Sequence, residues 1–324
     1  MKSFQGRIAV VTGGGTGMGR ELARQLAAEG CHVAMCDVIA ENMAETRELC
    51  LAAAPPGTRV TTTLADVSDE RQLEAFRDAV VREHQTKHVN LLFNNAGLGA
   101  ACSMIRDSRD DWEKTFNVCW FGVYYGTRVF LPLLLAADEA HLVNTSSVNG
   151  IWASLGPHTA HTAYSAAKFA VRGFTEALIN DFRLHAPHVK VSLVMPGHIG
   201  TSIVINSGRL LGREPEKMTD EQLAEARKSI ERLGFEIGGV SNDDLRMLLK
   251  QRAESFRDDA PMSAAEAAKV ILDGVRAERW RILVGSDAEL LDRLVRETPE
   301  EAYEMSFFER FVTQAGWQMP RPAR

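Results

Sequence analysis

Short apolar runs alternate along the chain with longer segments whose apolar residues recur at helical spacing. The first run, residues 6–12, is rich in β-branched residues, and residues 20–28 carry apolar side chains at helical spacing. The same alternation predicts strands near residues 6–12, 31–36, 58–64, 88–93, 140–145, 188–194 and 280–284, with helices between them. Buried strands that alternate with helices indicate an α/β fold, in which helices cover both faces of a parallel sheet.

Two of the predicted helices have a recognisable N-cap residue in the sequence. Ser68 precedes Asp69 and Glu70, and the stretch from Ser263 to Glu266 has the spacing of a capping box. We therefore expect helices to begin at these two serines.

Two segments extend beyond this alternation. Residues 202–259 predict at least two amphipathic helices, Thr219 to Leu233 and Ser241 to Phe256. The apolar residues of these helices are expected to pack on the core, a partner subunit or a substrate; they are Leu223, Ile230, Leu233, Leu245 and Leu249. Residues 290–324 form a tail with an aromatic cluster, expected to dock on its own domain or on a subunit: Tyr303, Phe307, Phe308, Phe311 and Trp317.

Composition narrows the class of protein. A chain of 324 residues with 45% apolar content can bury a large core, and a net charge of −6 without a basic run argues against nucleic acid and anionic membranes. The longest apolar stretch, residues 129–137, is too short to span a bilayer. Five cysteines without a Cys-x-x-Cys pair, and no readable secretory signal, predict a cytoplasmic protein with free thiols.

A glycine-rich turn follows the first predicted strand. Gly13, Gly17 and Gly19 occupy a Gly-x-x-x-Gly-x-Gly pattern between strand and helix, where backbone N–H groups can bind a pyrophosphate. The second strand ends at Asp37, whose carboxylate would accept hydrogen bonds from ribose hydroxyls and repel a 2′-phosphate. The sequence therefore predicts NAD rather than NADP, with Arg20 as the one nearby candidate for a 2′-phosphate partner.

Tyr164 and Lys168 lie four residues apart in a predicted helix, and thus on one face of it. An ammonium beside a phenol favours the phenolate and is expected to lower the pKa of Tyr164, so that the tyrosine can exchange a proton with a hydroxyl or carbonyl. By itself such a pair more often forms a half-exposed helix face.

In this order the motifs resemble those of the short-chain dehydrogenase/reductase family, over about residues 5–203. The further motifs are Leu64–Val67, Asn94–Gly97, Asn144–Ser147 and Pro196–Thr201. The resemblance implies Ser147, Tyr164 and Lys168 as catalytic residues, with Ser146 as the alternative serine. The cofactor-binding residues that it implies are Gly13, Gly15, Thr16, Gly17, Met18, Gly19, Asp37, Asp66, Val67, Asn95, Ala96, Gly97, Tyr164, Lys168, Pro196, Gly197, Ile199 and Thr201.

The resemblance also implies the architecture. It predicts one Rossmann-type domain over residues 1–324 with strand order 3-2-1-4-5-6-7, a helical lid at 202–259 and a C-terminal extension at 290–324. Two long helices, at about 102–135 and 162–185, commonly pair between subunits in the family, which implies a homodimer or homotetramer.

The implied reaction is NAD(H)-dependent interconversion of a secondary alcohol and its ketone, with Tyr164 as general acid/base. The long lid, Trp152 and Met195 favour a lipophilic substrate; Ile151 is expected to extend the apolar wall, and His158 or His161 to add a polar contact. Ser147 lacks the Gly-x-Ser-x-Gly context of a serine hydrolase, and no metal-ligand cluster is visible.

One expected residue is replaced. The family usually has an asparagine three residues before Gly122, where it holds a water that links the lysine to solvent, and here that position is Cys119. A thiol is a weak donor and acceptor. The substitution leaves open an NAD-binding scaffold or a weakly active enzyme, or a shifted register with Asn117 in the role. An enzyme that uses the same tyrosine for epimerisation or dehydration is a further alternative.

Overall fold

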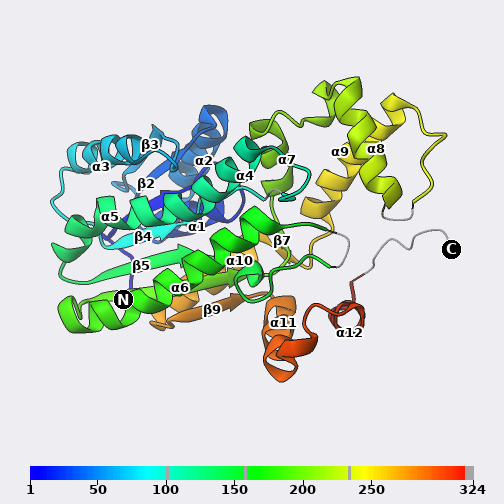
Figure 1. The fold of residues 1–324 in the computed structure, drawn as a ribbon. Helices are drawn as coiled ribbons and strands as arrows, with labels where there is room; N and C mark the ends of the chain where they lie inside the picture. Colours follow the sequence, from blue (N-terminus) through cyan, green and yellow to red (C-terminus); the bar gives the residue numbers. More distant parts are fainter. Residues whose placement is uncertain (100–101, 157–158, 233–234, 318–324) are drawn as a thin grey trace.

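A seven-stranded parallel sheet lies at the centre of the computed structural model, which describes residues 1–99, 102–156, 159–232 and 235–317 (Figure 1). Its order is β3-β2-β1-β4-β5-β6-β9. The strands are β1 (Ile8–Thr12), β2 (His32–Asp37), β3 (Val60–Leu64), β4 (Leu91–Asn94), β5 (Ala140–Thr145), β6 (Val189–Pro196) and β9 (Arg281–Val284). The predicted α/β fold and strand order are confirmed, although β4 begins later than predicted because a polar turn at Thr86 and His88 precedes it.

Helices cover both faces of the sheet (Figure 1). Alternate residues of each strand point to opposite faces; Val11 packs with α1 and α10, whereas Val10 packs with α3, α5 and α6. The helices are α1 (Gly17–Ala28), α2 (Ala40–Ala53), α3 (Glu70–His84), α4 (Arg109–Phe116), α5 (Gly122–Leu135), α6 (Thr162–His185), α7 (Ile203–Leu210), α8 (Asp220–Arg232), α9 (Asn242–Asp258), α10 (Ala264–Arg276), α11 (Ser286–Glu297) and α12 (Met305–Ala315).

The predicted helix starts are right at one serine and wrong at the other. Ser263 and Glu266 form the expected capping box at the start of α10. At α3 the N-cap is Asp69, which accepts from the Arg71 N–H, because Ser68 instead donates to Asp66.

A kinked helix runs along one face of the sheet. It begins at Arg109, not near residue 102 as predicted, because Ser108 caps α4. A π-helical turn, η1 (Asn117–Phe121), joins α4 to α5. Among the described residues, Arg109–Leu135 is the one helix long and apolar enough to cross a membrane, with a mean hydropathy of 1.4 in its most apolar 18-residue window. The core helix of a globular domain can have the same length and hydropathy.

The lid has a small core of its own. Between α7 and α9 the chain forms a short helix, η3 (Pro215–Lys217), and then α8; Leu223, Ile237 and Leu245 are buried between α8 and α9, with Ile230 and Leu249 packed against them. A two-stranded ladder, β7 (Ile199–Gly200) and β8 (Met262–Ser263), joins the two ends of the lid. The apolar lid residues therefore pack mainly on each other; of those predicted, Leu233 lies outside the described residues.

The C-terminal segment docks on its own domain, as predicted. After α11 a short helix, η4 (Pro299–Glu301), leads into α12. Phe307 and Phe311 of α12 are buried against Leu291 of α11 and Trp152 from the loop after β5.

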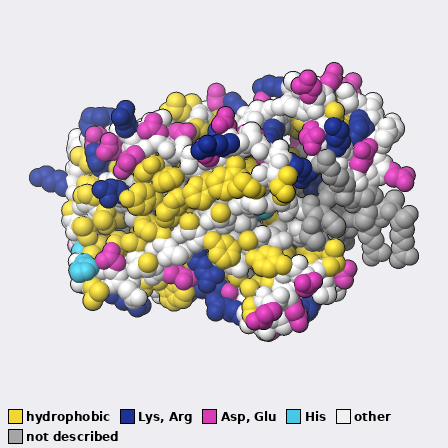
Figure 2. All heavy atoms as spheres, in the orientation of Figure 1, with side chains coloured by type: hydrophobic (Ala, Val, Ile, Leu, Met, Phe, Trp, Pro, Cys, Tyr) yellow, Lys and Arg dark blue, Asp and Glu magenta, His cyan; other side chains and the backbone are white. Residues whose placement is uncertain are grey.

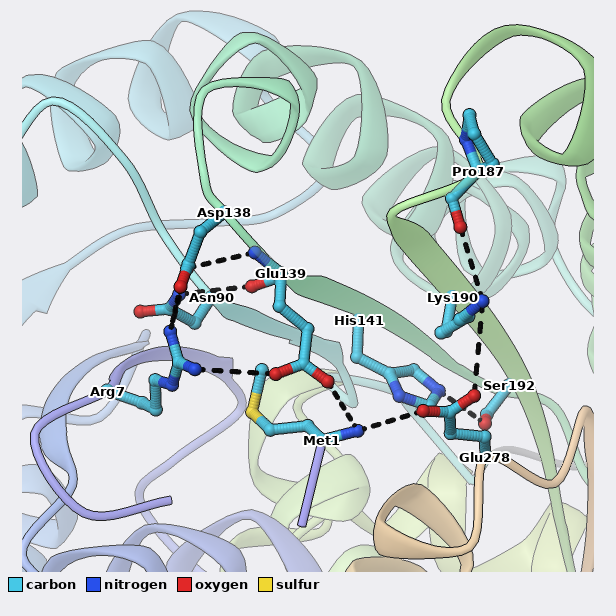
Figure 3. A network of polar contacts seen from close by, with 10 residues as sticks. All are labelled: Met1, Arg7, Asn90, Asp138, Glu139, His141, Pro187, Lys190, Ser192 and Glu278. Carbon is cyan, nitrogen blue, oxygen red and sulfur yellow. Dashed lines mark hydrogen bonds and ion pairs between the residues drawn. The ribbon is translucent and has the colours of Figure 1, made fainter. Parts of the chain in front are cut away.

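A polar network closes the sheet at the amino ends of its strands (Figure 3). The amino group of Met1 lies 2.7 Å from Glu139 Oε1 and 3.2 Å from Glu278 Oε1. Beside it, His141 Nε2 lies 2.7 Å from Ser192 Oγ. These ion pairs and hydrogen bonds occupy the amino ends of the strands. Ligands of parallel α/β sheets bind outside the carboxyl ends of the strands, so we expect the site at the opposite end.

Candidate active site

The glycine turn between β1 and α1 has the geometry of a pyrophosphate site. Gly17 has a φ of +56°, and a Cβ at Gly19 would overlap the carbonyl oxygen of Gly13, so both positions need glycine. Thr16, the N-cap of α1, makes no side-chain cap, and the first turn of α1 carries no acidic side chain. The first N–H groups of α1 are therefore available to an anion.

Asp37 is held at the end of β2 by backbone donors. Its Oδ1 accepts from the N–H groups of Val38 (2.8 Å) and Ile39 (3.1 Å), and its Oδ2 accepts from Gly15 (3.0 Å). Arg20 is turned to the other side of the turn, where it donates to Gly15 O and to Thr46. The charge beside the expected ribose position is thus a fixed carboxylate.

A cleft runs from this turn to Gly97. Its lining includes the predicted residues Gly13, Thr16, Gly17, Met18, Asp37, Asp66, Val67, Asn95, Ala96, Gly97 and Thr201. It also includes residues that the sequence prediction missed: Val38, Ile39, Ala65, Leu98, Lys114, Val118, Ile203, Asn206 and Leu210.

The missed residues fall into two groups. Ala65 lies inside the Leu64–Val67 motif, Val38 and Ile39 follow Asp37, and Leu98 follows Gly97, so these four could have been found from the predicted motifs. The others come from α4, η1 and α7, whose position over the cleft no local pattern reveals.

The first lid helix, α7, covers the cleft. Asn206 Nδ2 donates to Thr16 Oγ1 (3.0 Å), and Ser207 Oγ accepts from the Gly99 N–H (2.8 Å). These contacts tie the lid both to the glycine turn and to the loop after β4.

Several predicted residues shape the cleft without lining it. Gly15 supports Asp37, and the Gly197 N–H donates to Val284 O. Ile199 is buried in β7. Pro196, Gly19, Ser147, Tyr164 and Lys168 are also absent from the lining of this cleft.

The two asparagines after β4 support the sheet and the turn. Asn94 Nδ2 donates to Asn144 Oδ1 (2.9 Å) and Thr127 Oγ1 (3.1 Å) at the centre of the sheet. Asn95 Nδ2 donates to Thr12 O (3.1 Å), which joins the β4 loop to the start of the glycine turn.

Ser147, Tyr164 and Lys168 come together beside the cleft, where Tyr164 packs with the cleft residues Leu98 and Leu210. Ser147 lies close enough to Tyr164 to lower the pKa of its phenol. Lys168 Nζ lies 5.3 Å from the centre of the Tyr164 ring and donates to Thr145 O (2.9 Å). Ser146 points the other way and donates to Lys168 O (2.8 Å), so Ser147 is the serine at the tyrosine.

Burial controls the pKa values of this cluster. Burial, with a smaller contribution from Cys119, raises the pKa of Tyr164 and outweighs the lowering effect of Ser147. Burial also lowers the pKa of Lys168. The expectation that the lysine spacing lowers the pKa of Tyr164 is therefore wrong for the protein by itself, because the buried phenolate loses its hydration.

Cys119 occupies the position predicted for it. Its Sγ accepts from the Leu98 N–H and donates to Leu98 O, both at 3.4 Å, and the side chain is fully buried. The helix is in the π form here, and it brings Cys119 to the loop after β4 beside Lys168.

The loop after β5 differs from its predicted role. Trp152 is 4% exposed and packs on α12, Ile151 and Met195 are buried in one cluster, and none of the three lines the cleft. His161 is also buried, and its ring stacks on Tyr164 with centres 4.7 Å apart. Burial lowers the pKa of His161 to about 4. His158 lies outside the described residues.

Comparison with known proteins gives consistent matches. A family model described as short chain dehydrogenase matches residues 7–209. SadH of Mycobacterium tuberculosis, whose name describes an oxidoreductase, is 33% identical over 91% of this chain and 92% of its own. Levodione reductase of Leifsonia aquatica is 32% identical over 67% of this chain and 79% of its own.

Solved structures of the same family also resemble this chain. A short-chain dehydrogenase/reductase from Burkholderia phymatum in complex with NAD has a TM-score of 0.73 and 30% identity, and covers 93% of this chain and 96% of its own. A metagenomic short-chain oxidoreductase in complex with NADP has a TM-score of 0.53 and 29% identity, and covers 60% of this chain and 83% of its own.

Proposed function

Because the chain belongs to the short-chain dehydrogenase family, we propose that it interconverts a secondary alcohol and its ketone with NAD(H). The observation that carries this proposal is the cluster of Ser147, Tyr164 and Lys168 beside the cleft. A scaffold that only binds a nucleotide would not need these three side chains together.

Each residue of the cluster has a part in the proposed reaction. In the oxidative direction Tyr164 acts as the phenolate, a form that the positive charges of Lys168 and of bound NAD⁺ would favour, and accepts the hydroxyl proton of the alcohol. Ser147 hydrogen-bonds the same oxygen. Lys168 keeps a positive charge beside the tyrosine and binds the nicotinamide ribose. NAD⁺ supplies C4 of the nicotinamide as hydride acceptor, so the alcohol loses a proton and a hydride and becomes the ketone.

The fixed carboxylate of Asp37 supports NAD over NADP. It can accept from the adenosine ribose hydroxyls, and it repels a 2′-phosphate at the same place. Arg20, the candidate partner of such a phosphate, is bound to Gly15 O and Thr46.

A lipophilic substrate remains part of the proposal, but on different residues. Leu98 and Leu210 of the cleft pack in one apolar cluster with Tyr164, whereas Trp152 and Met195 lie elsewhere. The similarity to levodione reductase favours a ketone or its alcohol over epimerisation or dehydration.

We also propose a homodimer or homotetramer formed through α4, α5 and α6. Figure 2 shows a band of hydrophobic side chains over this face. Phe169 is 40% exposed there, and the half-buried Phe121 and Tyr125 stack with ring centres 5.3 Å apart. A light-scattering mass equal to a single chain would contradict the proposal.

The reaction is tested by following NADH from NAD⁺ and a panel of lipophilic secondary alcohols, with NADP⁺ in parallel. We expect NADH with the wild type and its loss, by at least about a hundredfold, with Tyr164→Phe, since removing a general acid/base costs this much. Tyr125→Phe, a tyrosine on α5 outside the cluster, is the matched control.

The outcomes separate the alternatives. Preference for NADP⁺ would refute the role of Asp37. Tight NADH binding without turnover of any alcohol would favour the scaffold, and substrate conversion without net NADH would favour epimerisation or dehydration.

A further inference from the structure

We propose that Asn149 is a positioning residue that orients the hydroxyl of Ser147 for the reaction proposed above, on which this inference rests. Asn149 follows β5 in the short helix η2 (Val148–Gly150) and is 3% exposed. Its backbone N–H donates to Ser147 Oγ at 3.1 Å. One lone pair of the serine oxygen is therefore taken by the chain that follows it.

The side-chain amide of Asn149 can point only one way. Its Nδ2 donates to two carbonyl oxygens, those of Trp152 (3.2 Å) and Ser154 (2.8 Å). Carbonyl oxygens only accept, so the NH₂ group must face them, and the amide oxygen must face Ser147. Ser147 Oγ donates to Asn149 Oδ1 at 3.4 Å.

The hydrogen bond to Asn149 orients the Ser147 hydroxyl but is weak. A distance of 3.4 Å is longer than a strong O–H···O bond. The hydroxyl proton is thus directed by the amide oxygen but can turn to a substrate oxygen at little cost. Meanwhile the same serine stays close enough to Tyr164 to lower the pKa of its phenol.

Asn149 also links Ser147 to the C-terminal segment. The loop that its NH₂ group holds is fixed at Trp152, whose Nε1 donates to Ala302 O at 2.6 Å, and at Ala153, whose N–H donates to Tyr303 Oη at 3.3 Å. The position of the catalytic serine therefore depends on a loop that residues far along the chain support.

Asn149→Ala and Asn149→Asp test this in the wild-type and Ser147→Ala backgrounds. The alanine removes the acceptor and both donors; the aspartate keeps an oxygen toward Ser147 but turns a second oxygen toward two carbonyls. We expect kcat to fall on the order of tenfold for each, because a misplaced group loses this much or more, with the KM for NAD⁺ unchanged. In the Ser147→Ala background neither change should cost anything further.

Asn90→Ala is the matched control. Asn90 is 1% exposed, and its amide ties Ile8 N–H and Glu139 O at the opposite end of the sheet, so its loss should lower the melting temperature and leave kcat unchanged. An unchanged kcat in Asn149→Ala, or an equal loss in both Ser147 backgrounds, would overturn the proposal.

A crystal structure of Asn149→Ala decides the point without turnover. We expect Ser147 Oγ to leave its place beside Tyr164, or the 152–154 loop to move; an unchanged serine and loop would overturn the proposal. If the wild type oxidises no alcohol, the proposed function fails by itself, and this second readout still tests Asn149.

Discussion

At the residue scale, Cys119 stands where the family usually has an asparagine, and its side chain still hydrogen-bonds to the backbone. The thiol accepts from and donates to the two backbone groups of Leu98, so neither is left unpaired. Counting from Gly122 was enough to predict which residue stands here. That its side chain joins the helix to the loop after β4 could not be predicted, because the π-helical turn changes which face residues 117–121 present.

We expect Cys119→Ala to be more destabilising than Cys50→Ala. Both thiols are fully buried, but no hydrogen bond of Cys50 is seen in the described residues, whereas Cys119→Ala leaves two buried backbone groups unpaired. The extra loss in the free energy of unfolding should be about 1–3 kcal/mol, measured by urea denaturation. Equal losses would mean that Cys119 only fills space.

At the element scale, the loop after β5 and helix α12 form one structural unit. Trp152 stacks on Phe308 with ring centres 6.3 Å apart and is buried with Phe307 and Phe311. The sequence predicted that the aromatic tail docks on its own domain or on a subunit, but it assigned Trp152 to the substrate. The hydrogen bond from Trp152 Nε1 to Ala302 O joins residues 150 positions apart in the chain, and no local periodicity predicts it.

Two changes at Trp152 should separate its hydrogen bond from its packing. Trp152→Phe removes the Nε1 donor to Ala302 O, and we expect it to lower the free energy of unfolding by about 1 kcal/mol. Trp152→Ala also removes the ring and should cost about 3–5 kcal/mol. Trp280, which is 44% exposed, gives the control: Trp280→Phe should stay within about 0.5 kcal/mol of the wild type in the same urea experiment. Equal effects of the two phenylalanine variants would exclude a stabilising Nε1 bond.

At the scale of the whole molecule, three buried histidines make the fold sensitive to acid. Burial lowers the pKa of His84 and His161 to about 4 and that of His141 to about 3, from a usual value of 6.5. Between these values the unfolded chain binds protons that the folded protein excludes. The free energy of unfolding is therefore unaffected by these groups above 6.5 and falls as the pH decreases toward 4.

Urea denaturation at several pH values between 7 and 4 measures this loss. We expect the curve to be less steep for His84→Gln, in which an amide can still reach Thr61, the present partner of His84. His185→Gln, at an exposed site on α6, should follow the wild type. A wild-type stability that stays constant from pH 6.5 to 5 would contradict the expectation.

The sequence by itself determined the strands, their order through the family resemblance, and the residues that meet at the carboxyl ends of β1, β2, β4 and β5. These features depend on local periodicity, on turns that require glycine and on motifs at strand ends, and each of these can be recognised in a short stretch of consecutive residues. Asp37, Ser147, Tyr164 and Lys168 could be named in this way because each follows or lies close to a predicted element.

Only the tertiary structure decided what surrounds those residues. It buried Trp152 against α12, gave the lid its own core around Leu223 and Leu245, and placed Asn149 in contact with Ser147. It also reversed the expected direction of the pKa of Tyr164. Burial and packing arise from segments far apart in the chain. The pKa values of the site residues and the contacts that position them therefore depend on the fold, whereas the types of residue in the site can be predicted from the sequence.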